Sequence, residues 1–145
     1  MGYDFGVLLG KITKEDVLGL KNDLIMLFDS EVIARGQYFQ ELRKFEGNIF
    51  ETIKWLYQQE EWHVSAIEQI LNKGNVLVKE KPLKPEKFGD DAMKIIKIDI
   101  IFEEKTVLQY KSVMEKAGGA LKEILTNLME EELVHVERLK KYVKE

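Results

Sequence analysis

Two Glu-x-x-His segments, placed at one fixed offset, constrain the fold of this chain more than any other feature. They are Glu60-Glu61-Trp62-His63 and Glu132-Leu133-Val134-His135, so the histidines stand at positions 63 and 135, an offset of 72. The same offset superimposes further identical residues, namely Glu31 and Glu103, Gln37 and Gln109, Tyr38 and Tyr110, Lys44 and Lys116, Gly47 and Gly119, and Leu56 and Leu128. The chain therefore contains an internal duplication, and two similar halves have to build the fold together.

Apolar residues recur at helical spacing in both halves and predict four long helices, over about 13–45, 48–72, 90–116 and 120–143. Thr13 is the expected N-cap of the first helix. Glycines interrupt each half near its centre, at Gly47 and at 118–119. Residues 1–12 are punctuated by glycine, which predicts a short irregular N-terminal arm. Residues 73–89 contain both prolines and predict a connection that is longer than the typical loop.

These lengths predict two helical hairpins joined by a long crossover. A helix of about 25 residues is about 37 Å long, and a connection of about 17 residues can span that length. The second and third helices would then run parallel. A four-helix bundle with one long crossover is the ferritin-like topology. We therefore predict a single all-α domain over residues 1–145 with a ferritin-like four-helix bundle.

Composition and charge exclude several other classes of protein. The net charge is −4 with no basic stretch, which argues against a nucleic-acid partner. The absence of cysteine excludes disulfides, thiolate catalysis and cysteine-ligated metal centres. No apolar run approaches 18 residues, so we expect no membrane span. The N-terminus lacks the basic and apolar regions of a signal peptide, so we expect a cytoplasmic protein.

The positions of the acids relative to the predicted turns bring them to one level of the bundle. Residues 31 and 60 are equidistant from the turn near Gly47, and residues 103 and 132 are equidistant from the turn at 118–119. In an antiparallel hairpin, such residues lie at the same height. Positions i and i+3 share a helix face, so each Glu of a Glu-x-x-His segment points inward with its His. Four carboxylates and two imidazoles should therefore meet in mid-bundle, at Glu31, Glu60, His63, Glu103, Glu132 and His135.

This set of side chains predicts a site for two metal ions. Four buried carboxylates without counter-charge would be prohibitively costly to desolvate, and two divalent cations would neutralise them. Mixed carboxylate and imidazole ligands suit iron or manganese better than calcium or magnesium. Asp29 and Glu104 are alternatives to Glu31 and Glu103. The alternative to a metal site is that the acids are solvated charges on the surfaces of long helices. We expect such surface positions for Glu41, Glu46, Glu115 and Glu123.

The two halves resemble the rubrerythrin and bacterioferritin group of ferritin-like di-iron carboxylate proteins, over residues from about 14 to 144. The resemblance rests on 31–38, Gly47 and 60–63 in the first half, and on 103–110, Gly119 and 132–135 in the second. It implies two iron ions, or iron with manganese. Glu60 and Glu132 would bridge the metals, Glu31 and Glu103 would be terminal ligands, and His63 and His135 would each cap one metal. Tyr38 and Tyr110 resemble the tyrosines that hydrogen-bond ligand carboxylates in this group.

The chain departs from the family pattern at several points. Thr106 stands where rubrerythrins carry an additional Glu, and Glu61 stands where bacterioferritins carry a haem-binding Met, so we expect no haem. A rubredoxin-like domain is missing, which implies an external electron donor of the rubredoxin kind. The chain ends soon after the fourth predicted helix, so we expect a homodimer rather than a cage of 24 subunits.

Three functions follow as hypotheses. The first is a rubrerythrin-like di-iron oxidoreductase that reduces hydrogen peroxide or dioxygen while Fe(II) becomes Fe(III). A substrate oxidase or hydroxylase is a variant of it. The second is a ferroxidase that stores or delivers iron, which a large hollow oligomer would favour. The third is a helical bundle without metal chemistry that acts in protein interaction.

Overall fold

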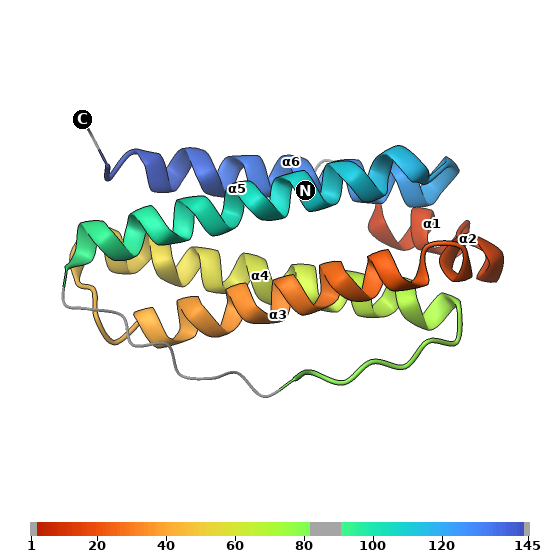
Figure 1. The fold of residues 1–145 in the computed structure, drawn as a ribbon, viewed down its shortest axis with the longest axis horizontal. Helices are drawn as coiled ribbons and strands as arrows, with labels where there is room; N and C mark the ends of the chain where they lie inside the picture. Colours follow the sequence, from red (N-terminus) through yellow and green to blue (C-terminus); the bar gives the residue numbers. More distant parts are fainter. Residues whose placement is uncertain (1–2, 82–90, 144–145) are drawn as a thin grey trace.

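The chain folds as an all-helical bundle, as the sequence predicts, with no strand among the described residues. The computed structural model describes residues 3–81 and 91–143. Four long helices form the bundle: α3 (Lys21–Glu41), α4 (Gly47–Lys73), α5 (Ala92–Lys116) and α6 (Gly119–Lys140). Two short helices precede them, α1 (Phe5–Gly10) and α2 (Lys14–Leu18), and both lie at one end of the bundle (Figure 1).

The long helices pack first as sequential pairs, α3 with α4 and α5 with α6, and each pair runs antiparallel (Figure 1). The second helix of each pair begins at a glycine with positive φ, +66° at Gly47 and +56° at Gly119. A side chain with a Cβ is strained in this region, which glycine enters freely. The two glycines related by the 72-residue offset therefore adopt the same left-handed backbone conformation at the turn of each half.

The N-terminal region differs from the prediction in two ways. Residues 5–10 form α1 rather than an irregular arm, because the Asp4 side chain caps the helix by accepting from the Val7 amide at 3.1 Å. The predicted helix 13–45 is interrupted after α2, and α3 ends at Glu41. Thr13 caps α2 as predicted, in a capping box with Asp16.

The interruption between α2 and α3 has a packing reason. Leu20 leaves the helical region, with φ −126° and ψ 22°, and the chain changes direction there. This turns the buried Val17 against the end of α4, where a Cβ on Gly74 would lie 2.6 Å from Val17 Cγ1. Only glycine permits that approach, so α2 closes one end of the bundle.

The connection after α4 runs back along the outside of the bundle over residues 75–81, next to α3 (Figure 1). Ion pairs fix it there, between Arg35 and Glu80 and between Lys81 and Asp29, the latter at 3.2 Å. The remainder of the predicted crossover, residues 82–89, lies outside the described residues. In Figure 1, α4 and α5 run in the same direction.

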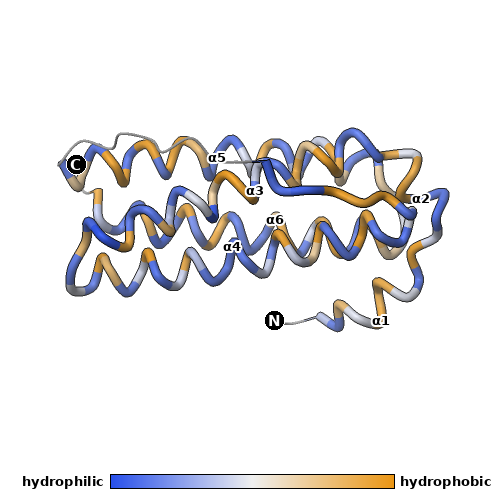
Figure 2. The backbone as a smooth tube through the Cα atoms, turned by 90° about the horizontal axis from the view of Figure 1, so that it is seen from below, coloured by the Kyte–Doolittle hydropathy of each residue, from blue (hydrophilic) through white to orange (hydrophobic). Residues whose placement is uncertain are grey.

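A polar layer divides the apolar core into two clusters. One cluster lies toward α1 and α2 and includes Leu24, Phe28 and Leu125, whereas the other lies toward the opposite end and includes Ile53, Leu56 and Ile96. Between them lie six fully buried ionisable side chains, here called the Glu/His cluster: Glu31, Glu60, His63, Glu103, Glu132 and His135. Hydrophilic and hydrophobic positions alternate along every long helix, which lets each helix present one face to this core (Figure 2).

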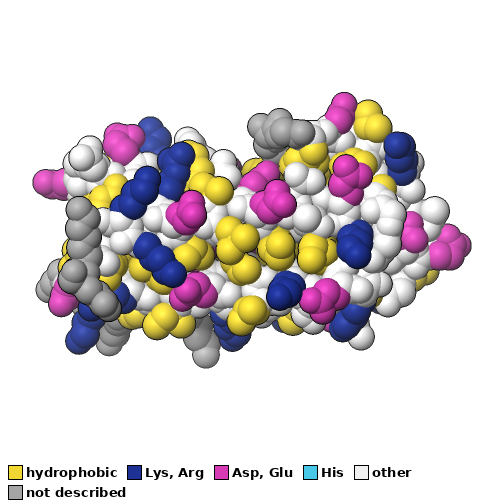
Figure 3. Space-filling model, turned by 90° about the horizontal axis from the view of Figure 1, so that it is seen from above, with side chains coloured by type: hydrophobic (Ala, Val, Ile, Leu, Met, Phe, Trp, Pro, Cys, Tyr) yellow, Lys and Arg dark blue, Asp and Glu magenta, His cyan; other side chains and the backbone are white. Residues whose placement is uncertain are grey.

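The outer face of α5 and α6 exposes a band of apolar side chains (Figure 3). Exposed apolar residues of these two helices include Ile101 and Leu108, at 67% and 66% exposure. No helix within the described residues is long and apolar enough to cross a membrane.

Truncating a core leucine should cost far more stability than truncating one of this outer band. Leu125 is fully buried, so Leu125→Ala should lower the free energy of unfolding by about 2–5 kcal/mol. Leu108→Ala makes the same chemical change at an exposed position and should shift it by no more than about 0.5 kcal/mol. Denaturant unfolding followed by circular dichroism measures both. Equal losses would contradict the assignment of the core.

Candidate metal centre

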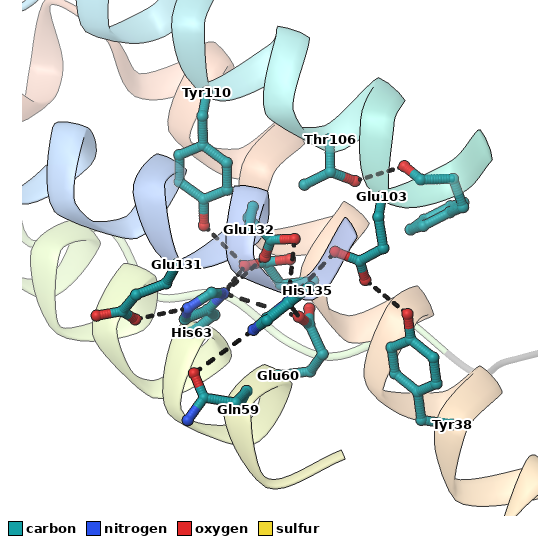
Figure 4. Close-up of polar contacts among 12 residues, drawn as sticks. Tyr38, Gln59, Glu60, His63, Glu103, Thr106, Tyr110, Glu131, Glu132 and His135 are labelled. Carbon is teal, nitrogen blue, oxygen red and sulfur yellow. Dashed lines mark hydrogen bonds and ion pairs between the residues drawn. The ribbon is translucent and has the colours of Figure 1, made fainter. Parts of the chain in front are cut away.

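All six side chains predicted to line a metal site lie together between the long helices, and Figure 4 labels five of them, all except Glu31. Glu31 comes from α3 and Glu103 from α5, while α4 and α6 each contribute one Glu and one His from their Glu-x-x-His segments. The i, i+3 spacing places the Glu and His of each segment on the inward face of their helix. Every one of the four long helices therefore contributes at least one group to the Glu/His cluster.

The alternative acids lie elsewhere. Asp29 is on the surface of α3 and pairs with Lys81, and Glu104 is half exposed and pairs with Lys140 at 3.3 Å. Neither joins the cluster, so the structure favours Glu31 and Glu103 as its members. One expectation about the other acids was wrong. Glu41 is fully buried rather than solvated, because it lies on the inward face near the end of α3.

The two histidines enter the cluster from opposite halves and both direct Nδ1 inward (Figure 4). Their rings are stacked, with centroids 5.4 Å apart. His63 Nδ1 lies 2.6 Å from Glu31 Oε2 and 2.7 Å from Glu132 Oε1. His135 Nδ1 lies 2.9 Å from Glu60 Oε1 and 3.4 Å from Glu132 Oε2. The two oxygens of Glu132 thus face different histidines, which is the arrangement that a bridging carboxylate requires.

The cluster resolves into two overlapping groups of potential ligand atoms. Glu31, Glu60, His63 and Glu132 offer atoms that all lie within 4.8 Å of one another, and so do Glu60, Glu103, Glu132 and His135. We call these the His63 position and the His135 position. They share Glu60 and Glu132, one from each half of the duplication. Each position combines three carboxylates with one imidazole.

Two buried tyrosines tie the halves together through the cluster. Tyr38 of α3 donates from Oη to Glu103 Oε1 of α5 at 2.8 Å, and Tyr110 of α5 donates to Glu31 Oε2 of α3 at 2.8 Å. Burial raises the pKa of both phenols well above the usual range, and the charge of the facing carboxylate adds to the effect. Both hydroxyls therefore stay protonated and donate, and each holds the carboxylate of the opposite half in place.

The carboxyl groups share protons when no metal neutralises them. Burial raises the pKa of Glu60 and of Glu103 well above the usual range, and the charge of Glu132 raises both further. Burial also raises the pKa of Glu132, but the positive charge of His135 and the hydrogen bonds to Glu103, His135 and His63 together outweigh it and leave that pKa well below the usual range. Glu132 is thus the carboxylate that stays ionised beside protonated neighbours.

The imidazoles behave as cations in the same state. Burial lowers the pKa of His63, but the charge of Glu31 and the hydrogen bonds to Glu131, Glu132 and Glu31 together outweigh it and leave the pKa well above the usual range. Burial likewise opposes protonation of His135, yet the charge of Glu132 and the hydrogen bond to Glu103 raise its pKa to about 10. Protons therefore balance the charge of the cluster, and a cation that binds there has to displace them.

The residues present could hold a metal ion. Among the described residues, Glu31 Oε1 and Glu60 Oε2 are buried and accept no hydrogen bond. Buried acceptors left without donors are costly, and a cation would satisfy them. Three carboxylates with one imidazole at each position suit iron, manganese or zinc.

The sequence analysis did not predict two contacts of the site. The outward nitrogen, Nε2, of His63 lies 2.9 Å from Glu131 Oε1, and that of His135 lies 3.5 Å from Gln59 Oε1. The 72-residue offset would have paired positions 59 and 131, each directly before the Glu of its segment, but their residues differ. Thr106, which stands where rubrerythrins carry an additional Glu, donates from Oγ1 to the Phe102 carbonyl at 3.1 Å. Its hydroxyl is thus directed at its own helix.

No protein-family model, curated protein or solved structure matches this chain. The case for a metal centre therefore rests on the burial, spacing and chemistry of the six side chains themselves. Buried Glu and His groups that could hold metal are what the structure provides.

Metal-free protein should lose stability as the pH rises from 6.5 to about 10. The pKa of His135 rises from 6.5 to about 10 on folding, so its stabilisation is complete below pH 6.5 and is lost as the pH approaches 10. Thermal midpoints of the chelator-treated protein, measured by circular dichroism at several pH values, test this. His135→Gln should flatten the slope. A midpoint that stays constant or rises over this window would contradict the charge balance.

Proposed function

We propose that this protein is a ferritin-like, rubrerythrin-like di-iron oxidoreductase that reduces hydrogen peroxide or dioxygen. The proposal depends most on the observation that two fully buried four-residue groups share Glu60 and Glu132. Two cations held by these common carboxylates would lie next to each other, so both could act on one small oxidant. Two adjacent metal ions could supply the two electrons that cleavage of one O–O bond takes.

The arrangement of helices supports the ferritin-like part of the proposal. The single Glu residues come from α3 and α5, and the Glu-x-x-His segments come from α4 and α6. This is the ligand pattern of di-iron carboxylate bundles, in which two helices give one Glu each and the other two give a Glu-x-x-His motif. The parallel course of α4 and α5, with residues 75–81 running back along α3, agrees with a long crossover.

The residues of the chain would hold the metals and keep water away. Four carboxylates offset the positive charge, and the two imidazoles complete the donor set through Nδ1. Tyr38 and Tyr110 would keep Glu103 and Glu31 oriented. The apolar clusters on both sides of the polar layer limit access of water, which strengthens electrostatic interactions inside.

Bound iron would supply the electrons. With two Fe(II) ions in the cluster, the one electron available from each would suffice, with two protons from solvent, to reduce one hydrogen peroxide to two water molecules. Dioxygen needs four electrons to reach water. Two Fe(II) ions supply only two of these electrons, and each turnover leaves Fe(III). The proposal therefore includes an external reductant of the rubredoxin kind that would return Fe(III) to Fe(II).

Anaerobic loading with Fe(II) should give about two irons per chain, and hydrogen peroxide should then produce the near-ultraviolet absorbance of Fe(III). The variant Glu60→Gln/Glu132→Gln removes both shared carboxylates and should bind iron at least about tenfold more weakly. Glu68→Gln/Glu130→Gln changes the same residue types on the same two helices at exposed positions and should bind as wild type.

Two results distinguish the hypotheses: which oxidant produces the Fe(III) absorbance, and whether iron uptake depends on Glu60 and Glu132. Absorbance that appears with dioxygen but not with peroxide would redirect the proposal to a ferroxidase or an oxidase. Iron uptake by wild type that is no greater than that of Glu60→Gln/Glu132→Gln would refute the di-iron centre. It would leave a helical bundle that acts in protein interaction.

A further inference from the structure

The duplication is broken at one contact that bears directly on the histidines. His63 Nε2 faces a carboxylate oxygen of Glu131 at 2.9 Å, whereas His135 Nε2 faces an amide oxygen of Gln59 at 3.5 Å (Figure 4). Each partner comes from the helix of the opposite half. Inside the cluster the two positions offer the same kinds of ligand atoms, so the asymmetry lies behind the rings.

The surroundings of the two outward-facing nitrogens also differ in charge. On the His63 side, Glu131 is largely covered, with 21% of its side chain exposed. On the His135 side, Trp55 meets the ring edge-on at 5.3 Å between centroids, and the Arg138 guanidinium lies 4.0 Å from the Trp55 ring centroid. One imidazole therefore has an anion behind it, and the other has a neutral amide with a cation one ring away.

This difference should change how well each imidazole binds a cation. A metal-bound histidine donates its other N–H to an acceptor that fixes the ring and raises its basicity, and loss of that acceptor typically weakens metal binding about 10–100-fold. A hydrogen bond to a carboxylate is about twice as strong as one to a neutral acceptor. The contact from His135 to Gln59 is also longer, which weakens this hydrogen bond further.

We propose that Glu131 is a positioning residue that makes the His63 position bind a divalent cation more tightly than the His135 position, so that the His63 position fills first. This inference rests on the proposed function only in requiring that the cluster binds two cations, and it does not depend on the oxidant. The positions would then differ in affinity although their ligand sets are alike in type.

Stepwise filling of the wild type is not a sufficient test, because two adjacent cations repel and even identical positions would fill in steps. Each position is therefore isolated. Glu103→Gln impairs the His135 position and leaves the His63 position, while Glu31→Gln does the reverse. Binding of Co(II) to each background is followed by its visible absorption, which reports coordination directly and requires no catalytic activity.

Adding Glu131→Gln should weaken Co(II) binding about 10–100-fold in the Glu103→Gln background and by less than about threefold in the Glu31→Gln background. Gln59→Glu should do the opposite and tighten binding in the Glu31→Gln background alone. Glu130→Gln removes a neighbouring exposed charge and should change neither by more than about twofold. Thermal melts without metal check that every variant folds.

Equal losses in both backgrounds, or no loss from Glu131→Gln, would overturn the inference. If a single-position background fails to fold, wild type, Glu131→Gln and Glu131→Gln/Gln59→Glu are compared. The first binding step should weaken in the single variant and recover in the double variant, and a failure to recover would also overturn the inference. Failure of wild type to bind any Co(II) would instead refute the proposed di-metal centre.

Discussion

Burial of six ionisable side chains in one layer is the constraint on which this structure depends. An ion removed from water costs several kcal/mol unless opposite charges and hydrogen bonds compensate it. The layer meets this requirement only when the four long helices keep their axial positions relative to one another. If a helix slid by one turn, a carboxylate would enter one of the two apolar clusters without a partner. The polar layer thus fixes the alignment of the bundle, while the apolar clusters supply the burial that stabilises it.

The duplication shows where the two halves must agree and where they are free to differ. Gly47 and Gly119 adopt the same left-handed turn, and the two tyrosines cross between halves to equivalent carboxylates. Away from the layer the halves diverge. The buried Glu41 and Asp99 correspond to apolar residues of the other half, Val113 and Leu27, which are also buried. The turns and the charged layer are thus where the two halves agree in both residue type and role.

The helices and the members of the cluster were predictable because both follow from spacing. A helix places i and i+3 on one face, and a hairpin places equidistant residues at one height, so positions alone favoured Glu31 over Asp29. The errors arose where a single residue changes the outcome. Asp4 caps α1 despite neighbouring glycines, and Leu20 breaks the predicted first helix. Glu41 lies three residues after Tyr38 on the buried face, so its helical spacing pointed inward, whereas its charge had suggested a surface position.

The sequence by itself determined four long helices, two equivalent halves and the six residues that meet between them, because helical periodicity and the 72-residue offset are properties of the chain. Only the tertiary structure decided which acids lie behind the histidines, how the shared carboxylates face both rings and which tyrosine reaches which half. These contacts join α3 to α5 and α4 to α6, helices that are distant in sequence. Their geometry depends on side-chain packing between elements, and no local pattern encodes it.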